Sequence, residues 1–391
     1  MRMRARSTLL AALGAVSTLA ALGAVSTLAL GACSVTAPEP LEETRLGCLV
    51  SAPAGFDDHA AGALTLAETE LAREAGVFSG TSSQRVSGGS ATSAALDRMH
   101  RQDCALTTVI GPGGADELAD FAAAHPKELF LGVSSGTEDL PKNVLSIDFD
   151  LVPPAFIAGY TAATASETGK VGVVVSHGFP QAGAIRSAFD AGVDLYNDEK
   201  DEGAATVTSY RSTTASASRS ISDTRTAGED YFDESFDDDA DVLVPFGSAA
   251  AMGVVTAADE KRKDLAEAAD DTEVEDEKSP ILPKLVWYGT AGGFSQSIVA
   301  SIEPNVRRGL RTMFPDWPQS KNPDEVAPAP KRGPEEISGF RVGDRGYMGT
   351  LDNGGVRIIA EDGFLSRVSD AGRGITDLRE RIKSGDIDLE R

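Results

Sequence analysis

The strongest constraint on the fold is a repeated alternation of short apolar segments with longer amphipathic ones. Residues 45–52, 105–110 and 170–176 are nearly continuous apolar runs, and stretches of helical pattern about ten residues or longer separate such runs. Short apolar strands separated by helices are typical of a parallel sheet that is covered on both faces. The sequence therefore predicts an α/β fold built from doubly wound parallel sheets.

This alternation occurs in two successive blocks, so we expect two lobes. Residues 295–314 are predicted to form one helix after the second block, and the proline-rich stretch 315–336 is interpreted as an exposed loop. The expected boundaries are a first lobe over 44–150 with part of 295–345 returning to it, a second lobe over 151–294, and a C-terminal crossover strand and helix over 346–391.

The first 33 residues differ from the rest of the chain. Three arginines within the first six residues precede an apolar run that contains LAALGAVST twice in tandem, at 10–18 and 19–27, and residues 30–33 read LGAC. A basic start, an apolar run and small residues before a cysteine resemble a bacterial lipoprotein signal peptide. The resemblance implies cleavage after residue 32 and a diacylglyceryl group on the sulfur of Cys33. Acyl chains, palmitate among them, would then anchor the chain at the extracytoplasmic face of the cell membrane.

An uncleaved transmembrane helix over residues 7–32 is the alternative, because this stretch is long enough to span a bilayer. In both interpretations the rest of the chain lies outside the cytoplasm. Residues 1–32 are thus assigned to the signal peptide, and residues 33–43, rich in proline and glutamate, to a short tether.

The chain is strongly acidic, with a formal net charge of −24. Without the three arginines of the signal, 33 basic residues face 60 acidic ones, which gives −27. Such a charge argues against nucleic acid or anionic lipid as a partner of the folded part. The acidic runs at 232–241 and 259–278 are interpreted as solvated faces.

No motif in the sequence supports catalysis. Residues 132–136 read GVSSG, which fits the string of a nucleophile elbow, but the helix that must follow the turn is missing from the pattern. A triad of Ser134, Asp148 and His177 could be drawn, but two predicted strand ends and a loop in the other lobe need not converge. We therefore expect a protein that is not an enzyme.

Metal and cofactor motifs are missing too. The four histidines, His59, His100, His125 and His177, show no ligand spacing, and the acidic runs lack the spacing of a calcium loop. The glycine-rich turns at 111–114 and 289–293 match no phosphate-binding pattern. The sequence predicts neither a metal nor a cofactor.

Cys48 and Cys104 each open a predicted strand. Outside the cytoplasm they can form a disulfide if the two strands are adjacent and parallel. Two buried thiols that pack as small apolar groups are the equally weighted alternative.

The predicted binding site follows from geometry, because ligands of open α/β sheets bind beyond the carboxyl ends of the strands. Polar side chains with an occasional phenylalanine at these ends suit a small polar solute with a flat face. The candidate ligand-binding residues are Phe56, Asp57, Asp58, Gly111, Gly113, Ser134, Ser135, Phe179, Phe246, Gly247, Gly289 and Thr290.

Five segments resemble one family, the basic membrane protein or PnrA-like substrate-binding lipoproteins of ABC importers. They are residues 143–166, 168–197, 240–258, 297–310 and 349–358. The resemblance implies a type I periplasmic-binding fold, with two α/β lobes that are joined by three crossovers and close on a ligand by hinge motion. It also implies a monomer that meets ABC permease subunits, and a purine nucleoside as ligand.

The nucleoside-binding residues of the family are only partly present in this sequence. The loop after the first strand keeps Asp57 and Asp58 but has Ala61 where the family places an aromatic ring over the base. The family's ribose-binding acid maps to Gly289 and its lysine to Ala300. Stacking and at least one charge-assisted contact are lost.

Two functions remain open. The first is a lipid-anchored solute-binding protein of an ABC importer, for which Phe179 and Phe246 supply an apolar face. The absence of basic residues from the candidate ligand-binding residues named above favours a neutral or cationic solute. The second is a ligand-poor envelope lipoprotein with a sensory or structural role.

Overall fold

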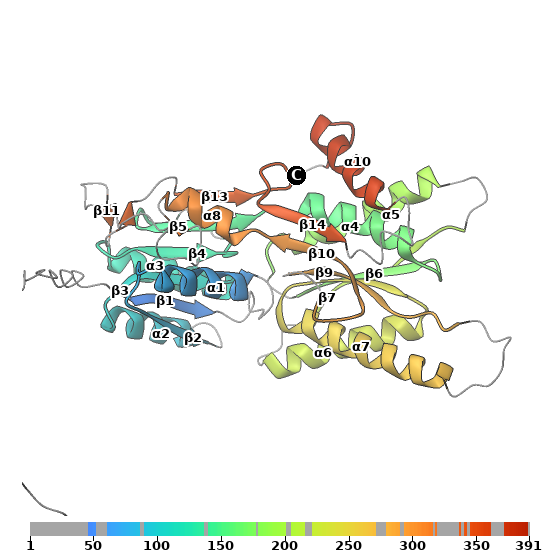
Figure 1. The fold of residues 1–391 in the computed structure, drawn as a ribbon, viewed down its shortest axis with the longest axis horizontal. Helices are drawn as coiled ribbons and strands as arrows, with labels where there is room; N and C mark the ends of the chain where they lie inside the picture. The colour runs from blue at the N-terminus through green and yellow to red at the C-terminus, as the bar shows by residue number, and fades with distance from the viewer. Residues whose placement is uncertain are drawn as a thin grey trace, which may run out of the picture. The chain divides into compact units, whose positions relative to one another are not determined.

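The apolar segments form two six-stranded sheets, which we call sheet A and sheet B (Figure 1). The leader, the tether and Cys33 lie outside the described residues, as does most of the proline-rich stretch. The computed structural model describes residues 46–51, 61–86, 90–136, 140–176, 179–200, 205–215, 221–270, 279–289, 293–315, 317–318, 336–337, 340–341, 345–360 and 371–389.

Sheet A is parallel throughout, in the order β13-β5-β4-β3-β1-β2. Its strands carry apolar side chains on both faces. Helices cover each face and bury these side chains. Its strands are β1 (Leu46–Ser51), β2 (Gly80–Arg85), β3 (Cys104–Ile110), β4 (Phe130–Val133), β5 (Val144–Phe149) and β13 (Gly346–Gly349).

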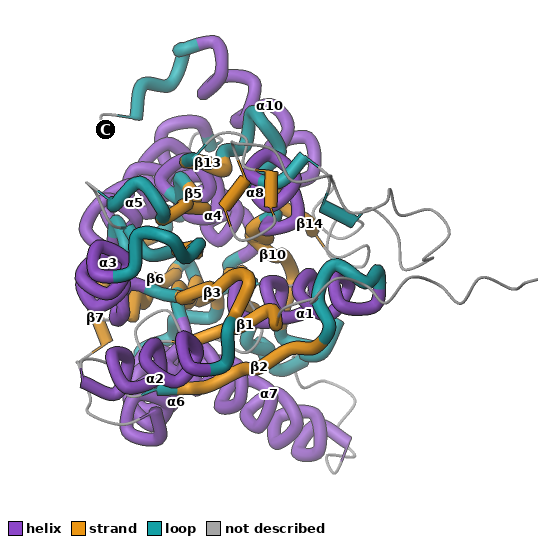
Figure 2. Tube along the Cα trace, turned by 90° about the vertical axis from the view of Figure 1, so that its left-hand side faces the viewer, coloured by secondary structure: helices purple, strands orange, loops and turns teal. Residues whose placement is uncertain are grey.

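Helices α1 (Ala61–Glu74) and α8 (Val306–Met313) cover one face of sheet A, where Leu49 and Leu131 lie in the same apolar cluster as Leu310. Helices α2 (Ser90–Arg101) and α3 (Ala115–Ala124) cover the other, where Val50 and Phe130 pack with them. A 3₁₀ turn, Pro112–Gly114, leads into α3. Figure 2 shows α1 and α2 on opposite sides of β1 and β2.

Sheet B has the order β14-β10-β9-β8-β6-β7, parallel except for the antiparallel pairing of β10 with β14. A small antiparallel pair, β11 (Glu336–Ile337) and β12 (Phe340–Arg341), stands apart from both sheets. The strands of sheet B are β6 (Lys170–Ser176), β7 (Thr208–Ala215), β8 (Val242–Phe246), β9 (Lys284–Tyr288), β10 (Ile298–Pro304) and β14 (Val356–Ala360).

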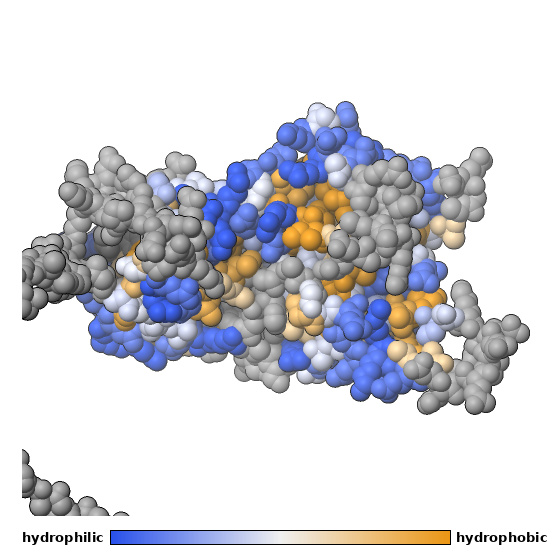
Figure 3. All heavy atoms as spheres, viewed as in Figure 1, coloured by the Kyte–Doolittle hydropathy of each residue, from blue (hydrophilic) through white to orange (hydrophobic). Residues whose placement is uncertain are grey.

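Sheet B is also covered on both faces. Helices α4 (Val152–Ala165) and α5 (Ala182–Glu199) share one cluster with Val173 and Val244, whereas α6 (Ile221–Asp237) and α7 (Ser248–Asp270) share another with Val174 and Leu243. The last helix, α10 (Ala371–Ser384), packs on α4. The surface over the acidic α7 is hydrophilic (Figure 3), as expected for a solvated face.

Glycines allow the helix pairs on sheet B to approach closely. A Cβ on Gly159 of α4 would collide with the Phe189 carbonyl of α5, and a Cβ on Gly192 of α5 would collide with the backbone of α4. Gly228 of α6 and Gly253 of α7 approach the facing backbone in the same reciprocal way. Both helix layers of sheet B therefore depend on small residues at the crossing points.

Within the described residues the chain passes between the two sheets three times. It leaves β5 of sheet A for α4, which packs against β6 and β8, and it leaves β10 of sheet B for α8, which packs against β5 and β13. The third passage connects β13 to β14. The arrangement is that of two doubly wound lobes joined by three crossovers.

Two local expectations differ from the structure. The predicted single helix over 295–314 is wrong, because its first half is strand β10 and only its second half is helix α8. Pro304 ends the strand, and the Asn305 side chain accepts a hydrogen bond from the backbone N–H of Arg308, which makes it the N-cap of α8. Helix α6 was not expected, because its many acidic residues mask the helical pattern. Its buried residues include Tyr231, Phe232 and Ser235.

Candidate functional site

The carboxyl ends of the strands carry unusual backbone conformations. Ser134, directly after β4, has a positive φ of 52°, although it is not glycine. Gly136 follows it at φ 62°. Non-glycine residues rarely adopt such angles, and when they do the position is commonly part of a functional turn. The loop after β4 is therefore tightly constrained.

Asp148, near the end of β5, lies beside this loop. The backbone N–H of Gly136 donates to Asp148 Oδ1 at 3.0 Å. Burial raises the pKa of the Asp148 carboxyl above its ordinary value of 3.8, and hydrogen bonds from the backbone N–H groups of Gly136 and Ser135 and from Ser146 offset part of that rise. A half-buried carboxyl at a strand end is suited to accept hydrogen bonds from a ligand.

The loop after β6 connects this corner to sheet B. The side chain of Gln181 donates from Nε2 to the Phe149 carbonyl at 3.2 Å and accepts from the backbone N–H of Leu151 at 3.2 Å. Pro180 lies near Gly136, since a Cβ on that glycine would be 3.4 Å from Pro180 Cγ. Strand ends of both sheets therefore meet around the β5 to α4 passage.

An aromatic cluster lies at the strand ends of sheet B. The ring of Phe179 is 5.5 Å from that of Tyr288, and Phe246 stacks on Tyr288 at 5.7 Å. Gly247 makes room for the Phe179 ring, because a Cβ on this glycine would lie 2.7 Å from the ring. Phe246 is 0% exposed and Phe179 8%, so Phe246 is enclosed within the cluster and Phe179 keeps only a small accessible surface.

Several hydroxyls at these strand ends have no partner. Among the residues that the structure describes, the buried Oγ atoms of Ser134, Ser135 and Ser176 make no hydrogen bond. Trp287 and Ser301, in the interior of sheet B, share this property, so it is not confined to the strand ends. A buried polar group without a partner costs free energy unless a ligand or water satisfies it.

The predicted site residues divide into two groups. Gly111, Gly113, Ser134, Ser135, Phe179, Phe246, Gly247 and Gly289 all lie at or just beyond the carboxyl ends of strands. The remaining predictions fall outside the described residues, namely Phe56, Asp57, Asp58, Thr290, His177 of the triad, and Cys33.

Sequence reasoning considered Asp148 only as a member of a catalytic triad, and it selected none of Asp148, Ser176 and Gln181 as a ligand-binding candidate. The signal for Asp148 is present in the pattern of β5, where polar residues alternate with Val144, Ile147 and other apolar residues. A polar side chain near the carboxyl end of a buried strand is the expected sign of a site at a sheet edge. No comparable pattern distinguishes Gln181.

The three positions that depart from the family pattern are also placed. Ala61 is the buried first residue of α1, and Gly289 directly follows β9. Ala300 is fully buried within β10, where it pairs with Ala360 of β14 and Val286 of β9. This position is thus part of the sheet and not of a helix.

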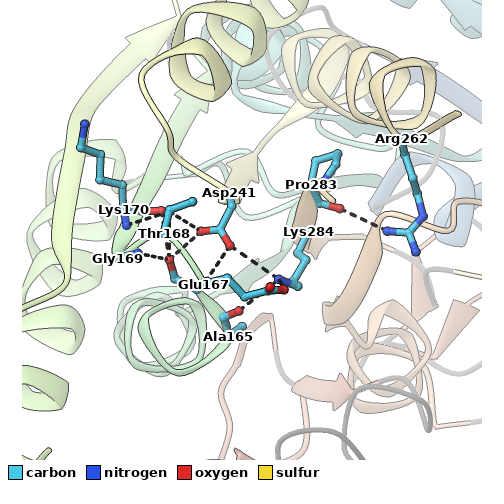
Figure 4. Close-up of polar contacts among 10 residues, drawn as sticks. Ala165, Glu167, Thr168, Gly169, Lys170, Asp241, Arg262, Pro283 and Lys284 are labelled. Carbon is cyan, nitrogen blue, oxygen red and sulfur yellow. Dashed lines mark hydrogen bonds and ion pairs between the residues drawn. The ribbon is translucent and has the colours of Figure 1, made fainter. Parts of the chain in front are cut away.

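A second polar cluster surrounds Asp241, at the opposite edge of sheet B (Figure 4). The carboxylate is 1% exposed and accepts from Ser166 Oγ at 2.5 Å, Thr168 Oγ1 at 2.8 Å and the Glu167 N–H at 2.8 Å. Lys284 Nζ lies 3.5 Å from Asp241 Oδ2. These contacts tie the turn before β6 to the starts of β8 and β9, so the cluster has a structural role.

Cys48 of β1 and Cys104 of β3 form a disulfide, with their Cα atoms 5.9 Å apart. The strands are adjacent and parallel, and the cysteines lie in the amino-terminal halves of both. The structure thus has the first of the two alternatives that the sequence left open.

Among the described helices, none is both long and apolar enough to span a bilayer. A family model described as ABC transporter substrate-binding protein PnrA-like matches residues 68–287. No curated protein gave a significant match.

Solved structures of similar fold support the predicted fold class. A solute-binding protein of an ABC transporter system from Aeropyrum pernix K1 is 17% identical with a TM-score of 0.63, covering 88% of this chain and 92% of that one. One from Conexibacter woesei DSM 14684 is 14% identical with a TM-score of 0.50, covering 88% and 98%. A transcriptional activator of the comK gene from Bacillus halodurans is 15% identical with a TM-score of 0.54, covering 87% and 98%. At these identities the likeness concerns the fold alone, which is that of type I periplasmic-binding proteins.

Proposed function

Because this chain belongs to the family of PnrA-like ABC transporter substrate-binding proteins, we propose that it captures a small polar solute outside the cytoplasm for an ABC permease. The family implies an extracytoplasmic location and a small-molecule ligand. The solute would bind at the carboxyl ends of the strands of sheets A and B, in the region of Asp148 and the loop after β4.

The observation that carries the proposal is the environment of Asp148. Its half-buried carboxyl is held by the N–H of Gly136 and has a pKa that is raised by desolvation, and the hydroxyls of Ser134 and Ser176, at the ends of β4 and β6, have no partner among the described residues. These groups match the hydroxyl or amino groups of a polar solute. Phe179 would contribute the edge of its ring.

The charge of the site favours a neutral or cationic solute. Asp148 supplies a carboxyl, and the predicted strand-end residues include no lysine or arginine to meet a phosphate. A phosphorylated solute would therefore be repelled. A purine nucleoside stays within the proposal, but without the ring at Ala61, the acid at Gly289 and the lysine at Ala300 it would bind weakly.

Calorimetry on the purified full-length chain tests this proposal with a panel of nucleosides, pentoses, hexoses, and neutral and cationic amino acids. At least one should bind, and the corresponding phosphorylated compound should not. Asp148→Asn should weaken binding at least tenfold, or about 1.4 kcal/mol, because a hydrogen bond to a charged group is lost. Phe179→Ala should weaken it less.

Asp120→Asn is the matched control, since it removes an exposed carboxylate from α3 and should leave the affinity unchanged. Equal affinity for a solute and its phosphorylated form would contradict the proposed site, as would tight binding that survives both Asp148→Asn and Phe179→Ala. A panel without any binder would contradict solute capture itself.

The lipid anchor is the second part of the proposal. It rests on the LGAC junction at 30–33 after a basic, apolar leader. Metabolic labelling with a fatty-acid analogue should modify the wild-type chain, whereas Cys33→Ser should remain unlabelled and unprocessed. Unchanged labelling of the variant would contradict an anchor at Cys33.

A further inference from the structure

Three potential metal ligands come together at the amino-terminal edge of sheet A. His100 is the penultimate residue of α2, His125 directly follows α3, and Glu128 lies in the turn before β4. His125 and Glu128 are three residues apart, whereas His100 is distant from both in the sequence, so no ligand spacing connects the three. The sequence shows no ligand spacing for the histidines, but the fold brings the rings of His100 and His125 together.

The distances between these side chains are short. His100 Nδ1 lies 2.7 Å from Glu128 Oε1, and the two imidazole rings are 4.6 Å apart between centroids. One ligand atom from each of the three side chains lies within 4.8 Å of the others. Tetrahedral coordination at about 2.1 Å needs ligand atoms about 3.4 Å apart. The longest separation would have to shorten by about 1.4 Å at most, and the His100–Glu128 separation would have to widen by about 0.7 Å. Side chains as exposed as His100 (44%) and Glu128 (28%) allow both changes.

The ring of His125 is oriented as a metal ligand requires. Its Nδ1 lies 2.8 Å from the carbonyl oxygen of Phe121. A carbonyl oxygen only accepts, so Nδ1 must carry the proton and Nε2 keeps its lone pair. Phe121 also stacks on the ring at 4.1 Å. Histidines that bind metals commonly donate their other N–H to a carbonyl in this way.

The turn that carries His125 and Glu128 is fixed from inside the lobe. The buried side chain of Asn143 directs Nδ2 to the carbonyl oxygens of Ala122, His125 and Glu128, each at 3.0 Å. Two of the three ligand positions are thus held by one buried amide. Preorganisation of this kind lowers the conformational cost of binding an ion.

Two electrostatic features favour a cation here, and they act against the positive charges of Arg98 and Arg101 in the last turn of α2 and of Lys127 beside Glu128. Helices α2 and α3 both end at this cluster, and the carboxyl end of a helix carries partial negative charge. The formal net charge of the chain is −24, which adds to the attraction.

We propose that His100, His125 and Glu128 bind one divalent transition-metal ion of the Zn²⁺ class. Imidazole nitrogens with one carboxylate suit Zn²⁺ better than Mg²⁺ or Ca²⁺, which prefer oxygen ligands alone. The ion would take the place of the proton between His100 Nδ1 and Glu128 Oε1 and would add His125 Nε2. Three protein ligands leave at least one coordination position open to water or to a group from outside the chain.

This site is separate from the proposed solute site. In a parallel α/β unit each helix starts near the carboxyl end of one strand and finishes near the amino end of the next. The ends of α2 and α3 therefore lie at the opposite edge of sheet A from Asp148. A variant can therefore lose solute binding without losing metal binding, and the reverse, so the two proposals are tested separately.

The test is calorimetric titration of the full-length chain, without a polyhistidine tag, with ZnCl₂ and separately with MgCl₂ at physiological salt. We expect one Zn²⁺ per chain and no comparable Mg²⁺ binding. The double variant His100→Ala, His125→Ala should lose this Zn²⁺ binding, and Glu128→Gln should weaken it about tenfold or more. Zn²⁺ should also raise the Tm of the wild type and not that of the double variant.

Asp120→Asn again serves as the control, because it removes the same charge as Glu128→Gln from an exposed position on α3. Near-ultraviolet circular dichroism verifies that each variant is folded, and the solute affinity gives an independent readout. A Zn²⁺ isotherm that is unchanged in the double variant would overturn the proposal. Equal loss of binding in Asp120→Asn and Glu128→Gln would overturn it too, since the acidic surface alone would then hold the ion.

Discussion

The two edges of the parallel sheets differ in how their polar and sulfur groups are satisfied. At the amino-terminal edges, a disulfide joins β1 to β3 in sheet A, and the Asp241 cluster ties β6, β8 and β9 together in sheet B. At the carboxyl edges, the hydroxyls of Ser134 and Ser176 have no partner among the residues that the structure describes, and the half-buried carboxyl of Asp148, with a raised pKa, lies next to a strained turn.

This difference shows how one architecture separates stability from binding. The groups of the disulfide and of the Asp241 cluster satisfy each other and leave nothing for a ligand to replace. At the carboxyl edge, the hydroxyls of Ser134 and Ser176 have no hydrogen-bond partner among the described residues, and a ligand can satisfy them. Substitutions in the disulfide or the Asp241 cluster should therefore lower stability, whereas substitutions at the carboxyl edge should change binding.

The largest effect should come from removing the disulfide. Cys48→Ala with Cys104→Ala releases a loop of about 57 residues in the unfolded chain, and the chain-entropy model gives a cost of about 4 kcal/mol. Urea unfolding of the oxidised wild type and the double variant measures the difference. Chemical reduction of the wild type should reproduce the loss, and two reactive thiols in the unreduced native protein would contradict the bond.

Asp241→Asn should have the next largest effect. The amide keeps the size of the side chain but leaves Lys284 beside an uncharged group, and its NH₂ faces the hydroxyl donors of Ser166 and Thr168. Breaking a buried ionic network by removing one partner costs about 3 kcal/mol or more. Denaturant titration should show this loss, with Asp120→Asn within about 0.5 kcal/mol of wild type.

Two serines allow a direct comparison of the edges at smaller scale. Ser166 donates to Asp241 at 2.5 Å, so Ser166→Ala should destabilise the chain by about 1.5 kcal/mol. Ser176 is buried without a partner among the described residues, so Ser176→Ala should be neutral or stabilise by up to about 1 kcal/mol. The same sign for both variants in thermal unfolding would remove the distinction between the edges.

The sequence predicted the architecture because the strands are buried on both faces. Continuous apolar runs such as CALTTVI in β3 mark a parallel sheet regardless of loop detail. Prediction failed where local pattern was ambiguous. The β10 segment has the apolar content of either element, and its boundary is marked only by Pro304 and Asn305.

The site was predicted only in part, for a physical reason. Residues directly after a strand, such as Ser134 and Gly247, follow from topology alone. Gln181 enters through a left-handed turn several residues beyond β6, and the pairing of His100 with His125 depends on how two helices pack. Contacts across the fold set these positions, and no local periodicity encodes them.

The smallest predicted effect concerns the ionisation of Asp148. Burial raises the pKa of its carboxyl in the folded state above 3.8, so the folded chain holds this proton to higher pH than the unfolded chain does. The stabilising contribution is therefore present in full at pH below 3.8 and is lost as the pH rises through the folded-state pKa.

Asp148→Asn removes this dependence and keeps an oxygen for the N–H of Gly136. Relative to wild type, the variant should gain stability, by less than about 1 kcal/mol, on going from pH 3.5 to pH 7. Urea titrations at both values measure this double difference, with Asp120→Asn as control. A gain of the same size in Asp120→Asn would mean that overall charge, and not the carboxyl edge of sheet A, sets the dependence.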